Sequence, residues 1–375
     1  MVSTVHFISF IVIVTMFSHQ LRLFVACLVA NAVLGSFSSP FGHEQLPNFF
    51  HNYTQFNHGA YGGTPRPVIE AQYKYVDQME SDIDPWMNGA DGYRKCIVNA
   101  REALSNITKA GDVEDTVLVD NATEGINVVL RNMEPPLGSD QFIFDLSTEY
   151  GPFAGLYEWI EARHGTKVIT ADVMFPVTGP ESFVDPVAAM LAANASTLNI
   201  RVAVISHISA YPCVVLPVRE LVDLFHAYDI PVVVDGAHAL GNIDVDIAAM
   251  GDPEYWFGNA HKWLFSPKSV AMLYVRHDLQ KVHVPAPMLV DSPETNAFTD
   301  RFIWTGTRDR TAYCAVADAI AYRQSLGGEV AIMEYNQKLA LNGGMFLVNL
   351  WQTRLLGPPS MMSSMVSVQV PTDDL

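Results

Sequence analysis

Basic residues and cysteines are both scarce in this chain. Among its 375 residues, Lys and Arg number 22 against 40 Asp and Glu, so the formal net charge is −18. A protein of this sign repels phosphate backbones, which argues against a nucleic-acid partner. The four cysteines form no Cys-x-x-Cys pair, so their spacing supports neither a disulfide framework nor a structural zinc site. We therefore expect no metal site. The cysteines are Cys27, Cys96, Cys213 and Cys314.

The composition excludes a disordered chain. Apolar residues make up 49% of the sequence and charged residues 17%, which is ample for a packed core. The length suits two domains, or one large domain with an appendage.

The first 35 residues differ in character from the rest. Residues 7–17 and 23–35 are apolar runs separated by a polar patch. Each is shorter than the roughly 20 apolar residues that span a bilayer. A signal peptide or membrane anchor is favoured, although the usual basic start is missing. The alternative is a misassigned start codon or a terminal hydrophobic arm. We expect the secretory pathway or a membrane anchor if the signal is genuine, with membrane contact only through residues 1–35, and the cytoplasm otherwise.

Short β-rich runs alternate with longer amphipathic stretches from about residue 110 onward. The runs are apolar throughout rather than alternating, which indicates burial on both faces. This pattern predicts an α/β fold with a mostly parallel sheet flanked by helices. The expected strands are residues 116–119, 142–144, 168–170, 202–205, 232–234 and 270–275. The expected helices are residues 65–80, 92–109, 123–131, 152–163, 186–193, 219–228, 312–326 and 329–351.

Four segments follow from this pattern. They are a signal or anchor (1–35), an N-terminal arm with helices (36–110), a large domain (111–290) and a small C-terminal domain (291–375). The small domain is expected to be partial, because residues 361–375 begin what would be an antiparallel strand and then stop.

Polar residues stand where the predicted strands end, which is where open α/β sheets bind ligands. Residues 122–125 open a helix and offer backbone N–H groups to an anion such as phosphate. Asp235 ends a buried strand and can hold a nitrogen heterocycle protonated. Lys262, in an apolar setting, can lose its proton and form an imine with an aldehyde. Together these are the parts that an enzyme dependent on pyridoxal 5′-phosphate supplies.

Several motifs extend this interpretation to a family. The segments are NHGAYGGTP (57–65), DNATEGINVVLR (120–131), SHISAYPCVVLPVREL (206–221), VVVDGAHALG (232–241) and YWFGNAHKWLFSPKSVAMLYV (255–275). In this order and spacing the chain resembles class V aminotransferases, in particular the isopenicillin N epimerase-like branch, from about residue 56 to 310. The resemblance implies the fold type I architecture of pyridoxal phosphate enzymes, the cofactor itself and a homodimer.

The resemblance also implies a role for each site residue. Lys262 forms the Schiff base with the cofactor and Asp235 faces the pyridine nitrogen, while His207 and His238 lie near the phenolic oxygen. The phosphate is held by the Ala122 backbone, Thr123, Asn259 and His261, Tyr150 lies at the ring face, and Thr307 reaches the phosphate of the other subunit.

Each role has a simpler structural alternative. Lys262 would be a surface lysine, and Asp235 or Thr123 would cap a turn or a helix. His207 and His238 would be satisfied loop histidines, and Thr307 would lie in an exposed turn. Sequons stand at Asn52, Asn106, Asn121 and Asn194, and that at Asn121 conflicts with a buried phosphate site.

The expected activity is that of a carbon–sulfur lyase acting on an amino acid, of the cysteine desulfhydrase or cysteine-sulfoxide lyase type. No cysteine follows Cys314, which disfavours persulfide transfer. The alternative catalytic activity is that of an amino-acid epimerase or an aminotransferase. The last arginine, Arg354, does not match the family's carboxylate-binding arginine. A short C-terminus would then compromise activity and leave a truncated, non-catalytic protein that binds pyridoxal phosphate.

Overall fold

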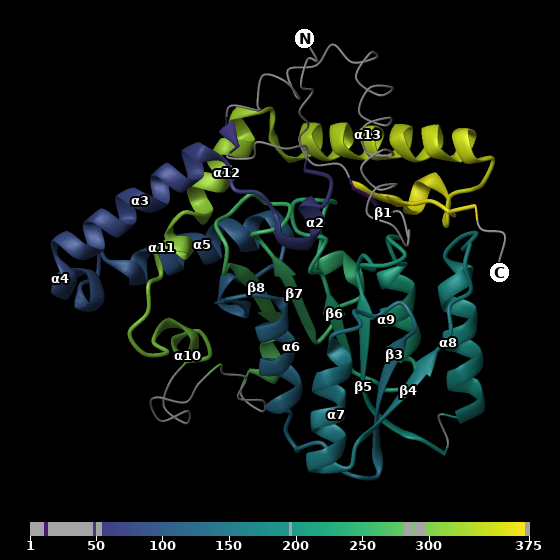
Figure 1. Cartoon of the computed structure of the whole chain (residues 1–375). Helices are drawn as coiled ribbons and strands as arrows, with labels where there is room; N and C mark the ends of the chain where they lie inside the picture. The colour runs from purple at the N-terminus through teal and green to yellow at the C-terminus, as the bar shows by residue number, and fades with distance from the viewer. Residues whose placement is uncertain are drawn as a thin grey trace.

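A computed structural model describes residues 11–13, 48–49, 55–194, 197–280, 287 and 297–371. Its centre is a seven-stranded sheet, drawn in blue to green in Figure 1. In sheet order the strands are β2 (Thr116–Val119), β8 (Ala271–Val275), β7 (Tyr255–Asn259), β6 (Val232–Asp235), β5 (Asn199–Ser206), β3 (Gln141–Leu146) and β4 (Lys167–Ala171). The pairings of β8 with β2 and β7 are antiparallel and the other four are parallel. The predicted mostly parallel sheet is therefore confirmed.

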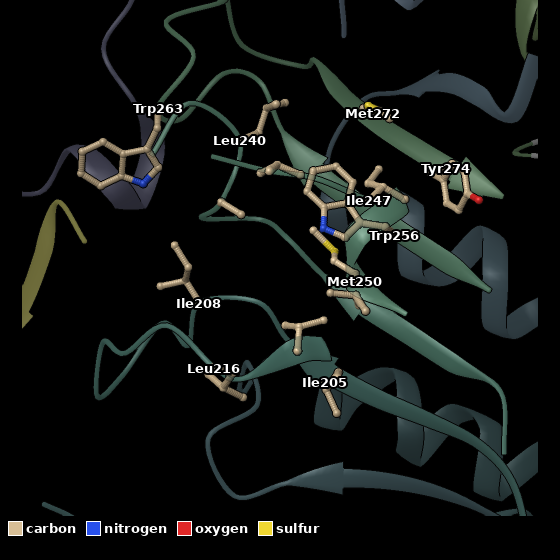
Figure 2. Close-up of a cluster of buried hydrophobic side chains, with 14 of the residues drawn as sticks. Ile205, Ile208, Leu216, Leu240, Ile247, Met250, Trp256, Trp263, Met272 and Tyr274 are labelled. Carbon is tan, nitrogen blue, oxygen red and sulfur yellow. The ribbon is translucent and has the colours of Figure 1, made fainter. Parts of the chain in front are cut away.

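Both faces of the sheet are buried, which explains why its strands are apolar throughout. Along β6, Val233 belongs to one hydrophobic cluster while Val232 and Val234 belong to the other. Helices α6 (Ala122–Arg131) and α7 (Phe153–His164) pack on the first face. Helices α8 (Glu181–Asn194) and α9 (Val218–His226) pack on the second. Figure 2 shows part of this second cluster, with Trp256 beside Met250.

One central strand is missing from the sequence prediction. β7 reads Tyr-Trp-Phe-Gly-Asn, with aromatic residues and a glycine in place of the β-branched residues that mark the other strands. Tertiary packing settles its conformation, because all five residues are buried between β6 and β8. The strand leads directly to Lys262, so it matters for the site.

Helices α3 (Arg66–Ser81), α4 (Ile83–Asn88) and α5 (Tyr93–Thr108) precede the sheet, and α11 (Thr311–Cys314) and α12 (Val316–Ser325) pack against α3 and α5. The expected helix over 312–326 is thus divided at Ala315. A disulfide joins Cys96 of α5 to Cys314 of α11 across 218 residues. The expectation that the cysteines have no disulfide role was wrong, because spacing in sequence does not show which helices pack together.

The C-terminal elements are α13 (Gly328–Trp351) and β9 (Met365–Ser367). β9 pairs in parallel with β1 (Ile11–Ile13), and an isolated antiparallel bridge joins Leu355 to Val368. The expected antiparallel pairing is thus present at this bridge, while β9 itself also pairs in parallel with β1. Two short helices, α2 (His58–Tyr61) and α10 (Asp300–Ile303), complete the described elements longer than three residues.

The predicted signal or anchor lies outside the described residues except for β1, and it stays a prediction, as do the four segment boundaries. No helix in the described ranges has the length and hydropathy that crossing a bilayer requires.

Candidate active site

Lys262 lies in the turn that follows β7, with its amine among buried groups. Its Nζ is 3.2 Å from Nε2 of His238, which follows β6. Burial lowers the pKa of Lys262 to about 8, although the charge of Asp235 opposes this shift. An amine with such a pKa is partly neutral near physiological pH, and the neutral form is the nucleophile.

Asp235 ends β6 and is only 5% exposed. One carboxylate oxygen, Oδ1, accepts a hydrogen bond of 2.8 Å from the backbone N–H of Ala237. Burial raises the pKa of Asp235, while that hydrogen bond and the charge of Lys262 oppose the rise. A buried carboxylate gains from a cationic partner, which a protonated pyridine nitrogen provides.

His207 and His238 are both buried beside Asp235 in the fold. The backbone N–H of His207 donates to the carbonyl oxygen of Asp235 at 2.7 Å, so the ends of β5 and β6 are held together. Trp256 Nε1 donates to His207 Nδ1 at 3.4 Å, so the remaining proton of the neutral ring lies on Nε2. Burial lowers the pKa of His207 to about 4 and also lowers that of His238. Both rings are therefore neutral hydrogen-bonding groups at pH 7.

The start of α6 and the turn after β7 meet in the structure. Asn121 is the N-cap, and its Oδ1 accepts from the N–H of Glu124 at 2.9 Å. The N–H of Ala122 donates to Asn259 Oδ1, also at 2.9 Å. Asn259 thus uses its carbonyl on the helix, and its amide N–H groups can donate to an anion. Thr123, exposed at this helix start, can add its N–H and hydroxyl as donors.

His261 lies next to Lys262 with its Nδ1–H donating to the carbonyl oxygen of Val270 at 3.0 Å. Burial lowers its pKa to about 4. Nε2 is the atom left for a phosphate, and it donates only when it carries a proton, which the charge of a bound phosphate would favour.

Two predicted residues are exposed. Tyr150 is 42% exposed, and its ring contacts Phe153 edge-on at 5.6 Å. Thr307 is exposed, and no hydrogen bond among the described residues ties it to the others. Its neighbour Arg308 does reach the helix start, where Nη1 lies 3.2 Å from Asp120 Oδ2.

The segment before α3, residues 58–62, packs against the backbone of the turn that carries Lys262. His58 Nε2 lies 2.9 Å from the carbonyl oxygen of Lys262. Gly62 has φ +70°, and a Cβ there would come within 1.8 Å of the carbonyl oxygen of His261. The structure shows a turn packed beneath the lysine.

Sequence reasoning assigned no role to four residues near the site. They are Glu149, Ser206, Trp256 and Arg323. Glu149 and Ser206 stand at strand ends, so their positions were a usable signal. Trp256 and Arg323 gave no such signal in the sequence. Only the folded chain brings Trp256 to His207, and Arg323 to Trp263 and Gly241.

These residues fit pyridoxal phosphate. His238 Nδ1 is buried and has no hydrogen-bond partner in the described structure, so a polar group is available beside the lysine. Donors at the start of α6, a buried carboxylate and a lysine of lowered pKa match the cofactor's phosphate, ring nitrogen and aldehyde. In the described residues, no group of His, Cys, Asp and Glu is arranged to hold a metal ion.

Comparisons with known proteins agree with this site. The family model described as Aminotransferase class-V matches residues 58–374. The chain is 30% identical to the L-cysteine desulfhydrase of Arabidopsis thaliana over 89% of this chain and 73% of that protein. It is 27% identical to the hercynylcysteine sulfoxide lyase of Schizosaccharomyces pombe over 88% and 84%. A solved structure of a mutant of C-DES, with glycine covalently linked to its pyridoxal phosphate cofactor, has a TM-score of 0.73 at 19% identity, covering 88% of this chain and 86% of that one.

Proposed function

Because this chain belongs to the class V aminotransferase family, we propose that it is a pyridoxal phosphate-dependent carbon–sulfur lyase acting on an amino acid. The observation that carries the proposal is Lys262, whose buried amine lies 3.2 Å from neutral His238 and close enough to Asp235 for their charges to interact. The desulfhydrase and sulfoxide lyase among its relatives support the choice of lyase chemistry.

The residues divide the work as follows. Asp235 would pair with the ring nitrogen of the cofactor, and the donors at the start of α6, together with Asn259, would hold its phosphate. Pyridoxal phosphate, when bound, supplies the electron sink for the electrons released at Cα. Lys262 takes the Cα proton of the substrate, and the Cβ–S bond breaks with its electron pair leaving on sulfur. With cysteine and water, the products are pyruvate, ammonia and sulfide. His238 and His207 are neutral, so they help to position Lys262 and Asp235 without adding a charge to the site.

The decisive experiment measures products from the purified, cofactor-loaded protein. We expect pyruvate and sulfide from L-cysteine, or pyruvate from an S-substituted cysteine, and none from Lys262→Ala. Lys74→Met, which removes an exposed lysine of α3, is the matched control and should keep full activity. Exchange of the α-hydrogen without pyruvate would contradict lyase chemistry and indicate an epimerase.

We also propose that the working unit is a homodimer in which Thr307 of one subunit approaches the phosphate of the other. The exposure of Thr307 leaves it available to a second subunit and supports this arrangement. Sedimentation equilibrium should give twice the chain mass, and Thr307→Ala should weaken cofactor binding without changing that mass.

A further inference from the structure

Glu149 is a second buried carboxyl group beside the site, and the chemistry above leaves it without a role. It stands in the turn after β3, next to Tyr150. Its Oε1 accepts hydrogen bonds from Ser206 Oγ at 2.7 Å and from the N–H of Tyr150 at 3.0 Å. Ser206 is the residue of β5 paired directly with Asp235 of β6. The two carboxyl groups therefore flank one residue at the end of the sheet.

No hydrogen bond compensates the burial of the other carboxyl oxygen of Glu149 in the described structure. Oε2 is buried without a hydrogen-bond partner, as are Asp145 Oδ1 and the hydroxyl of Tyr157. No Lys, Arg or His of the described structure lies within ion-pair distance of Glu149. The ionisable groups that interact with it are Asp235 from β6, Asp145 from β3 and Tyr157 from α7, all of them acids.

Both carboxyl groups accept hydrogen bonds, but Asp235 is better placed to carry charge because it also has the attraction of Lys262. Two like charges that interact in a buried site do not both persist. We propose that Glu149 is a positioning residue that keeps its own proton at neutral pH, so that Asp235 alone carries the negative charge of this pair. The purpose of that charge, pairing with the ring nitrogen, rests on the proposed function, whereas the protonation itself does not.

The electrostatics agree with the geometry. Burial, reinforced by the charge of Asp235, raises the pKa of Glu149 from 4.5 to about 8. Between these values the folded state binds a proton that the unfolded state has lost. The contribution of Glu149 to the stability of the native protein therefore falls as pH rises through this window, by up to about tenfold in the unfolding constant per pH unit.

The test is urea unfolding of the cofactor-free full chain across pH 4.5 to 8, comparing wild type with Glu149→Gln. The neutral amide keeps the shape of the group and cannot ionise. We expect Glu149→Gln to gain stability relative to wild type steadily as pH rises. Glu158→Gln removes an exposed carboxylate of α7 and is the control. The ratio of its unfolding constant to that of wild type should not change with pH. A flat ratio for Glu149→Gln would mean that Glu149 is ionised in the native state and would overturn the inference.

Infrared spectroscopy supplies a measurement that does not depend on the variant folding well. Wild type at pH 7 should show the carbonyl stretch of a protonated carboxyl group that disappears as pH passes about 8. Its disappearance near the ordinary carboxyl range instead would contradict the proposal. A protein that shows this titration but never develops the absorbance of lysine-bound cofactor would refute the proposed function and leave the protonation of Glu149 established.

Discussion

Arg323 Nη1 donates to the carbonyl oxygen of Trp263 at 2.7 Å, one residue beyond Lys262. Its Nη2 donates to the carbonyl oxygen of Gly241 at 3.0 Å, in the loop that carries His238. The guanidinium thus holds together the two loops whose side chains meet at the amine. Arg323 is fully buried, and Glu329 balances its charge with Oε1 2.6 Å from Nε.

Replacing Arg323 with Met should therefore be costly. It removes both loop contacts and leaves Glu329 as an uncompensated, largely buried charge, which typically costs about 3–5 kcal/mol. Urea unfolding measures this loss, and Arg323→Met with Glu329→Gln should recover part of it. Arg219→Met, which breaks the exposed pair with Asp223, is the control and should change stability by no more than about 1 kcal/mol. Equal losses for the two arginines would refute the bridging role.

The second prediction concerns how pH controls cofactor capture by Lys262. Burial lowers its pKa to about 8. The fraction of Lys262 that carries a neutral amine therefore rises with pH until about that value. The rate at which added pyridoxal phosphate develops its lysine-bound absorbance should rise about tenfold per pH unit below 8 and level off above it. Asp235→Asn removes the charge that raises this pKa, so its plateau should begin at lower pH. A wild-type profile still rising steeply beyond pH 9 would show an ordinary lysine.

Asp235→Asn should also separate cofactor capture from turnover. The amide keeps the size of the side chain but cannot pair with a ring cation, and a hydrogen bond to a charged group is worth about 1.5–3 kcal/mol. We expect the variant to bind the cofactor through Lys262 and to lose about 10- to 100-fold in kcat. Asp223→Asn, an exposed change on α9, provides the comparison. Unchanged kcat in Asp235→Asn would remove this residue from the proposed chemistry.

The sequence predicted those features that depend on local pattern. Strands buried on both faces produced continuous apolar runs, and the polar residue that ends one of them is Asp235. Lys262 was identified by its apolar setting and Asn259 by the family resemblance, because the strand before them was not predicted. The aromatic strand β7 and the break in the helix over 312–326 escaped because packing, not propensity, decides them. The contacts of Arg323, His58 and Cys96 join elements more than 200 residues apart or on separate loops, so no local pattern reports them.

The last prediction concerns the disulfide between Cys96 and Cys314. It closes a loop of 218 residues, and constraints of this kind typically add about 2–4 kcal/mol to the free energy of unfolding. Cys314 follows Tyr313, whose hydroxyl donates to Asp120 Oδ1 at 2.8 Å, one residue before the N-cap of α6. A reducing agent should therefore lower both the stability of wild type and its affinity for pyridoxal phosphate.

The double variant Cys96→Ser with Cys314→Ser is the matched control for that experiment. It should behave like reduced wild type and should not respond to the reducing agent, because its remaining described cysteine, Cys213, is a buried thiol. If stability falls and cofactor affinity does not, the bond braces α5 and α11 without influence on the phosphate site. If neither changes, the two helices are held by packing alone, and the covalent link contributes nothing measurable to the fold.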